Sequence, residues 1–279
     1  MNFESVWLAI APHTVLDYHK IKNIQFLLED TLARGVPGDT CECGVYRGGV
    51  SVLMAKILEV GTRHHLMFDS FTGLPPLNPE KDLPLYQQGT LACPADKVID
   101  LMNDLNLTNV EIYPGWFHDT LPKLPHDRAI CLAHIDCDLY DSTVTCLEEI
   151  YPRLSPGGVM IFDDYFDISG GERRAVDDFL NRNHNELLFA GPVEQVFFYK
   201  GRKLQADDLR HLYRGEMILG RHLSLEHLEN DLDYAEYLRT GKIMSALPGG
   251  SLTAATKLAH KTIEIHRLHK EIAKQLGSR

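Results

Sequence analysis

Apolar residues recur along residues 17–199 at two alternating spacings, which predict helices and strands in turn. A helix is expected over residues 17–34, because its apolar residues share one face and Gly35 with Pro37 would end it. Those apolar residues are Ile21, Ile24, Leu27, Leu28 and Leu32. Further helices are expected over residues 51–58, 96–105, 142–154 and 173–181.

Short apolar runs between these helices predict the strands. They cover residues 40–45, 65–68, 110–113, 129–135, 159–162 and 193–199. Strands that alternate with helices are typical of a parallel sheet with helices on both faces. We therefore expect an α/β domain over residues 1–202.

Two segments depart from this alternation. Residues 72–94 contain five prolines, which predict a long irregular surface loop. After residue 203 the pattern becomes helical, and a helical extension is expected over residues 203–279. Its last helix carries Leu258, Ile265 and Ile272 at heptad spacing. That helix would either dock on its own domain or join two copies into a homo-oligomer.

Acidic residues and glycines gather where the expected strands end. They are Glu42 to Gly49, Asp69, Gly115, Asp136, Asp138, Asp163 and Asp164. Open α/β sheets bind ligands outside the carboxyl ends of their strands. We therefore expect one functional site at this edge.

The first group, ECGVYRGG at residues 42–49, leaves the expected strand 40–45 and enters the next expected helix. Its pattern is ExGxxxG, whereas a dinucleotide site would read GxGxxG without an acid. Glu42 suits a cationic ligand, such as the amino group and sulfonium of S-adenosylmethionine. Asp69 could accept hydrogen bonds from both ribose hydroxyls. A glycine turn with chance acidic neighbours is the alternative.

The second group is Asp136-x-Asp138, and the third is Asp163-Asp164. Carboxylates that converge at neighbouring strand ends repel one another, and a hard divalent cation would relieve the repulsion. Oxygen ligands favour Mg²⁺, Mn²⁺ or Ca²⁺ over zinc. Some of the acids could instead cap helices, as Asp141 or Ser142 could do before residues 142–154.

Histidines and cysteines carry less chemistry in this pattern. His64, His65, His134 and His211 are assigned packing or surface roles, whereas His118 is kept as a candidate because it follows Gly-Trp-Phe at a strand end. The six cysteines lie mostly in apolar stretches without CxxC pairs, so we expect them to be buried and reduced. The chain has no GxSxG motif.

Composition narrows the class of protein. The 279 residues are 44% hydrophobic and 24% charged, with a net charge of −11 and no basic cluster, which disfavours a nucleic-acid partner. No apolar run approaches the roughly 20 residues of a membrane span, and the first residues lack a basic signal-peptide region. A cytoplasmic protein without a membrane partner is expected.

Five motifs, taken together, resemble one known family. They are ECGVYRGGVS, FDSFTGLP, GWFHDTLP, HIDCDLYDST and YPRLSPGGVMIFDDY, and they span about residues 30–200. This part of the chain is similar to the macrocin O-methyltransferase (TylF/MycF) family. Its members are Mg²⁺-dependent class I methyltransferases that act on sugar hydroxyls of natural products. Tyr46 stands where that family commonly has Trp.

The resemblance implies a Rossmann-like methyltransferase fold and a role for each motif residue. The cofactor S-adenosylmethionine would lie against Glu42, Gly44, Tyr46, Gly48, Asp69, Ser70, Phe117 and His118. Mg²⁺ would be held by Asp136, Asp163 and Asp164, and Asp138 would be the general base. The more distant catechol O-methyltransferases use a lysine base, but Leu139 and Tyr140 offer none.

The expected function is therefore Mg²⁺-dependent O-methylation of a sugar or other vicinal diol in a small glycosylated natural product. A catechol-type methyltransferase and a cephalosporin-hydroxylase-like enzyme are the alternatives. The hydroxylase lacks support because no set of two histidines and one carboxylate for iron is visible. An inactive binding module is disfavoured, because it would be expected to have lost acids at the sheet edge and all four are present. A nicotinamide dehydrogenase is disfavoured because the GxGxxG motif is missing.

Overall fold

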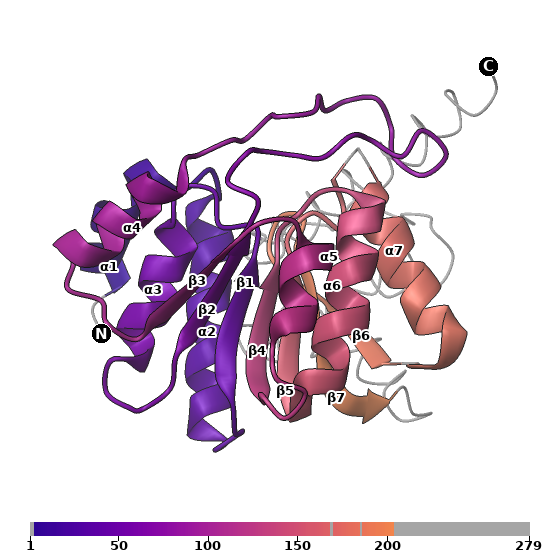
Figure 1. Ribbon diagram of the computed structural model, residues 1–279. Helices are drawn as coiled ribbons and strands as arrows, with labels where there is room; N and C mark the ends of the chain where they lie inside the picture. Colours follow the sequence, from indigo (N-terminus) through magenta and orange to yellow (C-terminus); the bar gives the residue numbers. More distant parts are fainter. Residues whose placement is uncertain (1–2, 168–169, 185, 204–279) are drawn as a thin grey trace, which may run out of the picture.

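Seven strands form one mixed sheet in the computed structural model, which describes residues 3–167, 170–184 and 186–203 (Figure 1). The strand order is β3-β2-β1-β4-β5-β7-β6. The strands are β1 (Asp39–Cys43), β2 (His65–Asp69), β3 (Val110–Pro114), β4 (Ile130–Ile135), β5 (Leu154–Phe162), β6 (Glu186–Ala190) and β7 (Val196–Lys203). Strands β1 to β5 run parallel, and β7 is antiparallel to both β5 and β6.

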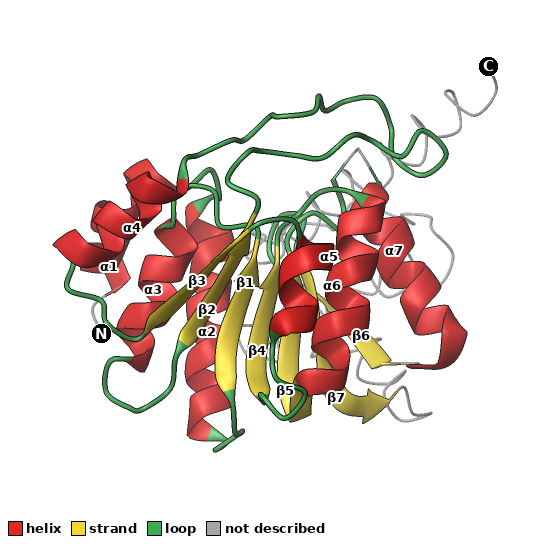
Figure 2. Cartoon of the chain, in the orientation of Figure 1, coloured by secondary structure: helices red, strands yellow, loops and turns green. Residues whose placement is uncertain are grey.

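Helices cover both faces of the sheet, as the sequence predicts (Figure 2). Helices α1 (Phe3–Ile10), α2 (Tyr18–Ala33), α3 (Gly49–Leu58) and α4 (Ala95–Asp104) bury their apolar residues on one face. On the other face lie α5 (Phe117–Thr120), α6 (Tyr140–Arg153) and α7 (Gly171–Phe179). Short 3₁₀ turns occupy Ala11–His13 and Leu121–Lys123, and a π-helical turn follows α7 at Leu180–His184. All six cysteines are buried with free thiols, as expected.

The expectation of an all-parallel sheet is wrong at one edge. The strand predicted over residues 193–199 begins only at Val196, as β7, and it forms a hairpin with β6, which was not predicted. Gln195 N donates to the Pro192 carbonyl at 3.1 Å, and Val193 takes a positive φ of 58°. Helix α1 was not predicted either. Strand β5 begins five residues earlier than expected, because Pro156 and the two following glycines form a bulge against β4.

The Pro-rich loop 72–94 is irregular, as predicted, and it crosses the carboxyl edge of the sheet (Figure 2). Its two arms meet at Leu74, whose N–H donates to Thr90 O and whose carbonyl accepts from Gly89 N, both at 2.9 Å. At its far end the Asp82 carboxylate accepts a hydrogen bond from Tyr140 N at 2.9 Å and so caps α6.

The helical extension predicted over residues 203–279, with its heptad positions and its role in homo-oligomerisation, lies outside the described residues. Within the described part of the chain, no helix combines the length and apolar character that a membrane crossing requires.

Candidate active site

The turn after β1 packs directly on the end of β4. Gly44 has a φ of +97°, and a Cβ there would lie 2.7 Å from the Asp136 carbonyl carbon and closer still to its oxygen. Gly44 N donates to Phe68 O, and Asp136 N donates to Cys43 O, both at 2.9 Å. These contacts join the ends of β1, β2 and β4, and they require glycine at position 44.

A pocket opens at this junction, above the ends of β1, β2 and β4. Its lining consists of Val15, Gly44, Tyr46, Asp69, Ser70, Gly73, Leu74, Pro75, Leu91, Trp116, Phe117, Asp136, Cys137, Asp138 and Ser142. The structure therefore brings together five of the residues predicted for the cofactor and two of the predicted carboxylates. The remaining lining comes from the Pro-rich loop, from Val15 before α2, and from Trp116, Cys137 and Ser142.

Asp69 ends β2 and holds the glycine turn in place. One carboxylate oxygen accepts from Val45 N at 2.7 Å and from Tyr46 N at 3.0 Å, and the other accepts from Phe71 N at 2.7 Å. Burial raises the pKa of Asp69, although these amides oppose the rise. A carboxylate offers about four acceptor positions, so one remains for a ligand hydroxyl.

Three predicted cofactor residues lie outside this lining. Glu42 is buried beneath the turn, where its carboxylate accepts from the Ser51 hydroxyl and faces His134 and His65. Burial opposes its ionisation, but hydrogen bonds from His134 and His65 lower the pKa of Glu42. Gly48 begins α3 against Met102. His118 is exposed and borders an adjoining pocket, which shares Phe117 with the first.

Asp163 is the best-partnered of the predicted metal ligands. One carboxylate oxygen accepts from Lys20 Nζ of α2 at 2.7 Å, and the other accepts from Gln195 Nε2 at 2.6 Å. Burial would raise the pKa of Asp163, but the Lys20 charge and the bonds with Lys20 and His134 hold it well below the usual range. Asp163 is therefore an ionised, buried carboxylate.

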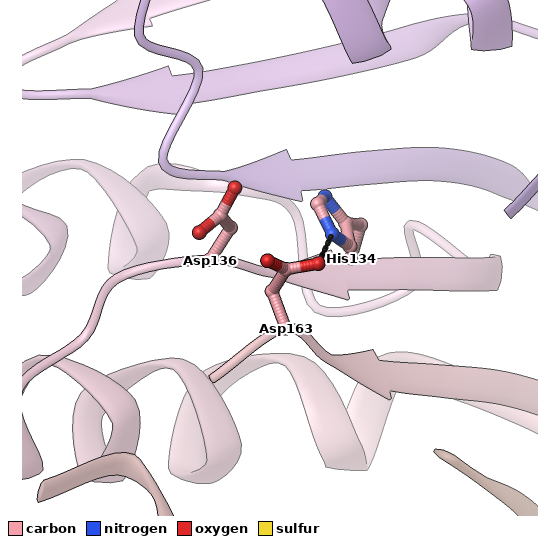
Figure 3. Close-up of side chains that lie close together, drawn as sticks. All are labelled: His134, Asp136 and Asp163. Atoms are coloured by element: carbon pink, nitrogen blue, oxygen red, sulfur yellow. Dashed lines mark hydrogen bonds and ion pairs between the residues drawn. The ribbon is translucent and has the colours of Figure 1, made fainter. Parts of the chain in front are cut away.

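His134 joins Asp136 and Asp163 in a tight group where β4 and β5 end (Figure 3). One ligand atom from each lies within 4.8 Å of the others. His134 Nδ1 is 3.4 Å from Glu42, and Nε2 is 3.4 Å from Asp163. Burial opposes protonation, but these two hydrogen bonds outweigh it and raise the pKa of His134 well above its usual value. A protonated imidazole cannot bind a metal, so His134 acts here as a cation between two carboxylates.

Asp136 and Asp164 have fewer partners than Asp163, and the nearest cation to Asp164 is Lys20, whose Nζ lies 3.7 Å from Asp164 Oδ1. Burial and neighbouring carboxylates raise the pKa of both well above the usual range. Asp164 Oδ2 is buried without a hydrogen-bond partner, and Asp164 N donates to Glu172 at 2.7 Å. An unpartnered buried oxygen among several carboxylates is donor chemistry that suits a hard divalent cation, and the metal set of Asp136, Asp163 and Asp164 stays a prediction.

Asp138 borders the same pocket and is 6% exposed. Its backbone has a φ of +58°, and its carbonyl accepts from Glu172 N at 3.1 Å. Burial raises the pKa of Asp138 to about 6, with Asp167 and Asp163 contributing and Tyr86 opposing.

Sequence reasoning missed several residues of this site. Lys20, Glu172 and Gln195 come from α2, α7 and the β6–β7 turn, and no motif marks them. His134 was assigned a packing role, although its place two residues before Asp136 in a buried strand was a usable signal.

Taken together, the sheet, the glycine turn and the acids at the strand ends define a class I methyltransferase fold. A solved structure of the O-methyltransferase NovP is 32% identical, with a TM-score of 0.61 over 68% of this chain and 83% of that chain. The calicheamicin methyltransferase CalS11 shares the fold at 23% identity, with a TM-score of 0.57 over 71% of this chain and 91% of that chain.

The chain belongs to the macrocin O-methyltransferase (TylF) family, whose profile matches residues 7–197. It is 39% identical over 170 residues to 8-demethyl-8-(2,3-dimethoxy-alpha-L-rhamnosyl)-tetracenomycin-C 4'-O-methyltransferase of Streptomyces olivaceus, a match covering 57% of this chain. Mycinamicin III 3''-O-methyltransferase of Micromonospora griseorubida is 36% identical over 168 residues, or 55% of this chain. The matched regions span 64% and 65% of these two relatives. The resemblance drawn from the five motifs is confirmed.

Proposed function

We propose that this protein transfers a methyl group from S-adenosylmethionine to a hydroxyl of a sugar or other vicinal diol in a glycosylated small molecule. The observation that carries the proposal is one pocket bordered by Gly44 and Asp69 and also by Asp136 and Asp138. A cofactor and an acceptor hydroxyl could therefore meet beside a buried carboxylate. The related enzymes that methylate glycosylated natural products support this acceptor class.

The cofactor would lie over the glycine turn. Gly44 presents no side chain there, and Asp69 keeps one acceptor position for a ribose hydroxyl. Phe117 offers an aromatic face for the adenine. Glu42 would act from beneath the turn, because Ser51 and His134 already engage its carboxylate. This position gives it a supporting role, not a direct contact.

Asp136, Asp163 and Asp164 would hold Mg²⁺. When bound, the ion would supply a Lewis acid that makes an acceptor hydroxyl more acidic. Lys20 and Gln195 fix the Asp163 carboxylate from behind, so its orientation does not depend on the ion. The buried Asp164 oxygen lacks such a partner and is the ligand that gains most from a cation.

Asp138 would accept the proton of the reacting hydroxyl. An alcohol is a weak nucleophile near neutral pH, so removing its proton assists attack on the methyl group. With a pKa of about 6, Asp138 is ionised at pH 7 yet more basic than an ordinary aspartate. The apolar lining from Leu74, Leu91 and Trp116 would keep water away from this step.

An acceptor screen with methyl-radiolabelled S-adenosylmethionine tests the proposal. Free sugars, glycosylated macrolides, phenolic glycosides and a lone catechol would be compared, each with Mg²⁺ and with a chelator. We expect label on diol-bearing sugars, and less of it with the chelator. Transfer to the catechol alone would support the catechol-type alternative, and full activity with the chelator would refute the metal requirement. Calorimetry should show S-adenosylmethionine binding and no NAD binding.

A further inference from the structure

Helix α7 begins against the segment that carries the proposed base. Helices α6 and α7 lie side by side on one face of the sheet (Figure 1). A Cβ on Gly171, the first residue of α7, would lie 3.0 Å from the Asp138 carbonyl oxygen and 2.9 Å from Tyr140 N. It would also overlap the Asp82 carboxylate, which caps α6. Glycine at this position therefore allows the start of α7 to pack directly on residues 138–140.

Glu172, the next residue, bonds to both acidic segments of the site. Its backbone N–H donates to the Asp138 carbonyl at 3.1 Å. Its carboxylate oxygen Oε1 accepts from Asp164 N at 2.7 Å. Glu172 is fully buried, so water does not compete for either hydrogen bond. A single residue thus joins the backbone of the proposed base to the backbone of a proposed metal ligand.

Both of these backbones lie outside regular structure and need such a connection. Asp138 has a φ of +58°, which is uncommon for a residue with a side chain and persists only where the surroundings fix it. Asp164 lies beyond the end of β5 at Phe162, and its N–H donates to Glu172 instead of to a neighbouring strand. The two bonds to Glu172 therefore set the separation between positions 138 and 164.

We propose that Glu172 is a positioning residue that fixes Asp138 and Asp164 relative to each other, so that the proton acceptor and the cation ligand face the same acceptor hydroxyl. It acts through the reach of its hydrogen bond and not through its charge. Its second oxygen, Oε2, has no hydrogen-bond partner among the described residues, so an amide in its place breaks no bond. The inference rests on the proposed function, because Asp138 and Asp164 have these roles only in that reaction.

Two substitutions separate the reach of the side chain from its charge. Glu172→Gln keeps the length and an oxygen that can accept from Asp164 N, so kcat and the Kd of Mg²⁺ should stay within about twofold of wild type. Glu172→Asp keeps the charge but is shorter, so its carboxylate withdraws from Asp164 N. It should lower kcat roughly ten- to a hundredfold, the cost of a small displacement of reacting groups, and calorimetry should show weaker Mg²⁺ binding. The Kd of S-adenosylmethionine should change by less than about twofold in both variants, because Asp69 and the glycine turn are untouched.

Glu186→Asp is the matched control. Glu186 of β6 is also buried and accepts from the Tyr151 hydroxyl at 2.5 Å, but it lies at the end of the β6–β7 hairpin opposite to Gln195. This variant should keep the kcat and the Mg²⁺ affinity of wild type. Hydrogen–deuterium exchange adds a measurement that does not depend on methyl transfer. The Asp164 amide should exchange roughly tenfold faster in Glu172→Asp, the scale of one lost hydrogen bond, and at the wild-type rate in Glu172→Gln and in the control.

The outcomes separate this inference from the proposed function. Wild-type kcat in Glu172→Asp, or an equal loss in Glu172→Gln, would overturn the positioning role. Unchanged exchange of the Asp164 amide in Glu172→Asp would overturn it too, as would a similar loss of kcat in the Glu186→Asp control. Absence of methyl transfer by the wild-type protein to every diol acceptor would refute the proposed function itself, and the role of Glu172 with it.

Discussion

Replacing Gly44 by alanine should damage both the fold and the cofactor site. The new Cβ would lie 2.7 Å from the Asp136 carbonyl carbon, so the ends of β1 and β4 would have to separate. A side chain in the left-handed region costs about 1–2 kcal/mol. Weakening the two hydrogen bonds, Gly44 N to Phe68 O and Asp136 N to Cys43 O, adds about 1 kcal/mol each. The total is about 3–4 kcal/mol, or roughly 6–16 °C in Tm for a domain of this size.

Gly35→Ala is the matched control. Gly35 also has a positive φ, +69°, but its Cβ would meet no heavy atom within 4 Å. It should therefore lose only the conformational part, roughly 2–8 °C. Differential scanning calorimetry gives both Tm values, and titration calorimetry gives the affinity for S-adenosylmethionine, which should fall only in Gly44→Ala. Equal Tm losses in the two variants would refute the contact between Gly44 and Asp136 as the cause.

Three further changes separate the roles of the site residues. Asp138→Asn should lower turnover by roughly 10²–10⁴-fold while Mg²⁺ and cofactor affinities stay near wild type, and rescue by Mg²⁺ would contradict its role as base. Asp164→Asn should weaken Mg²⁺ binding in calorimetry and regain activity at high Mg²⁺, whereas an unchanged titration would remove it from the ligand set. Asp69→Ala should weaken S-adenosylmethionine binding by at least about 1.5 kcal/mol, and unchanged affinity would reject its ribose role. Limited proteolysis should cut loop 72–94 more slowly once cofactor is added, and equal cutting would argue against a lid.

The sequence predicted the local part of this architecture well. Helix α2, the loop 72–94 and the five parallel strands follow from apolar spacing and proline content. The acids at the ends of β2, β4 and β5 were found because a parallel sheet places its carboxyl ends together. Each of these predictions depends on the local sequence, that is, on residues that are close together along the chain.

Contacts between distant segments were not predictable in this way. Lys20 and Asp163 are 143 positions apart, and a lysine on an otherwise ordinary helix gives no sign of its partner. The β6–β7 hairpin was not predicted. Recognising two strands there requires the turn at Pro192, and the apolar pattern does not encode the geometry of that turn. Glu42 is predicted to contact the cofactor, and the apolar pattern could not show that its buried carboxylate is already bound by Ser51 and His134.

The β6–β7 hairpin also bears on the order in which the site can form during synthesis. Gln195 lies in its turn, where it donates to Asp163 and accepts from Asn23 of α2 at 3.1 Å, so an early helix and the last hairpin meet behind one carboxylate. Strand β7 enters the sheet between β5 and β6, and until it is made β5 remains an open edge. A nascent chain that stops before residue 195 can therefore complete the glycine turn and its Asp69 bonds while Asp163 still lacks its amide partner. We therefore expect the glycine turn that binds the cofactor to form first. The acidic site should reach its final geometry only after β6 and β7 have emerged from the ribosome.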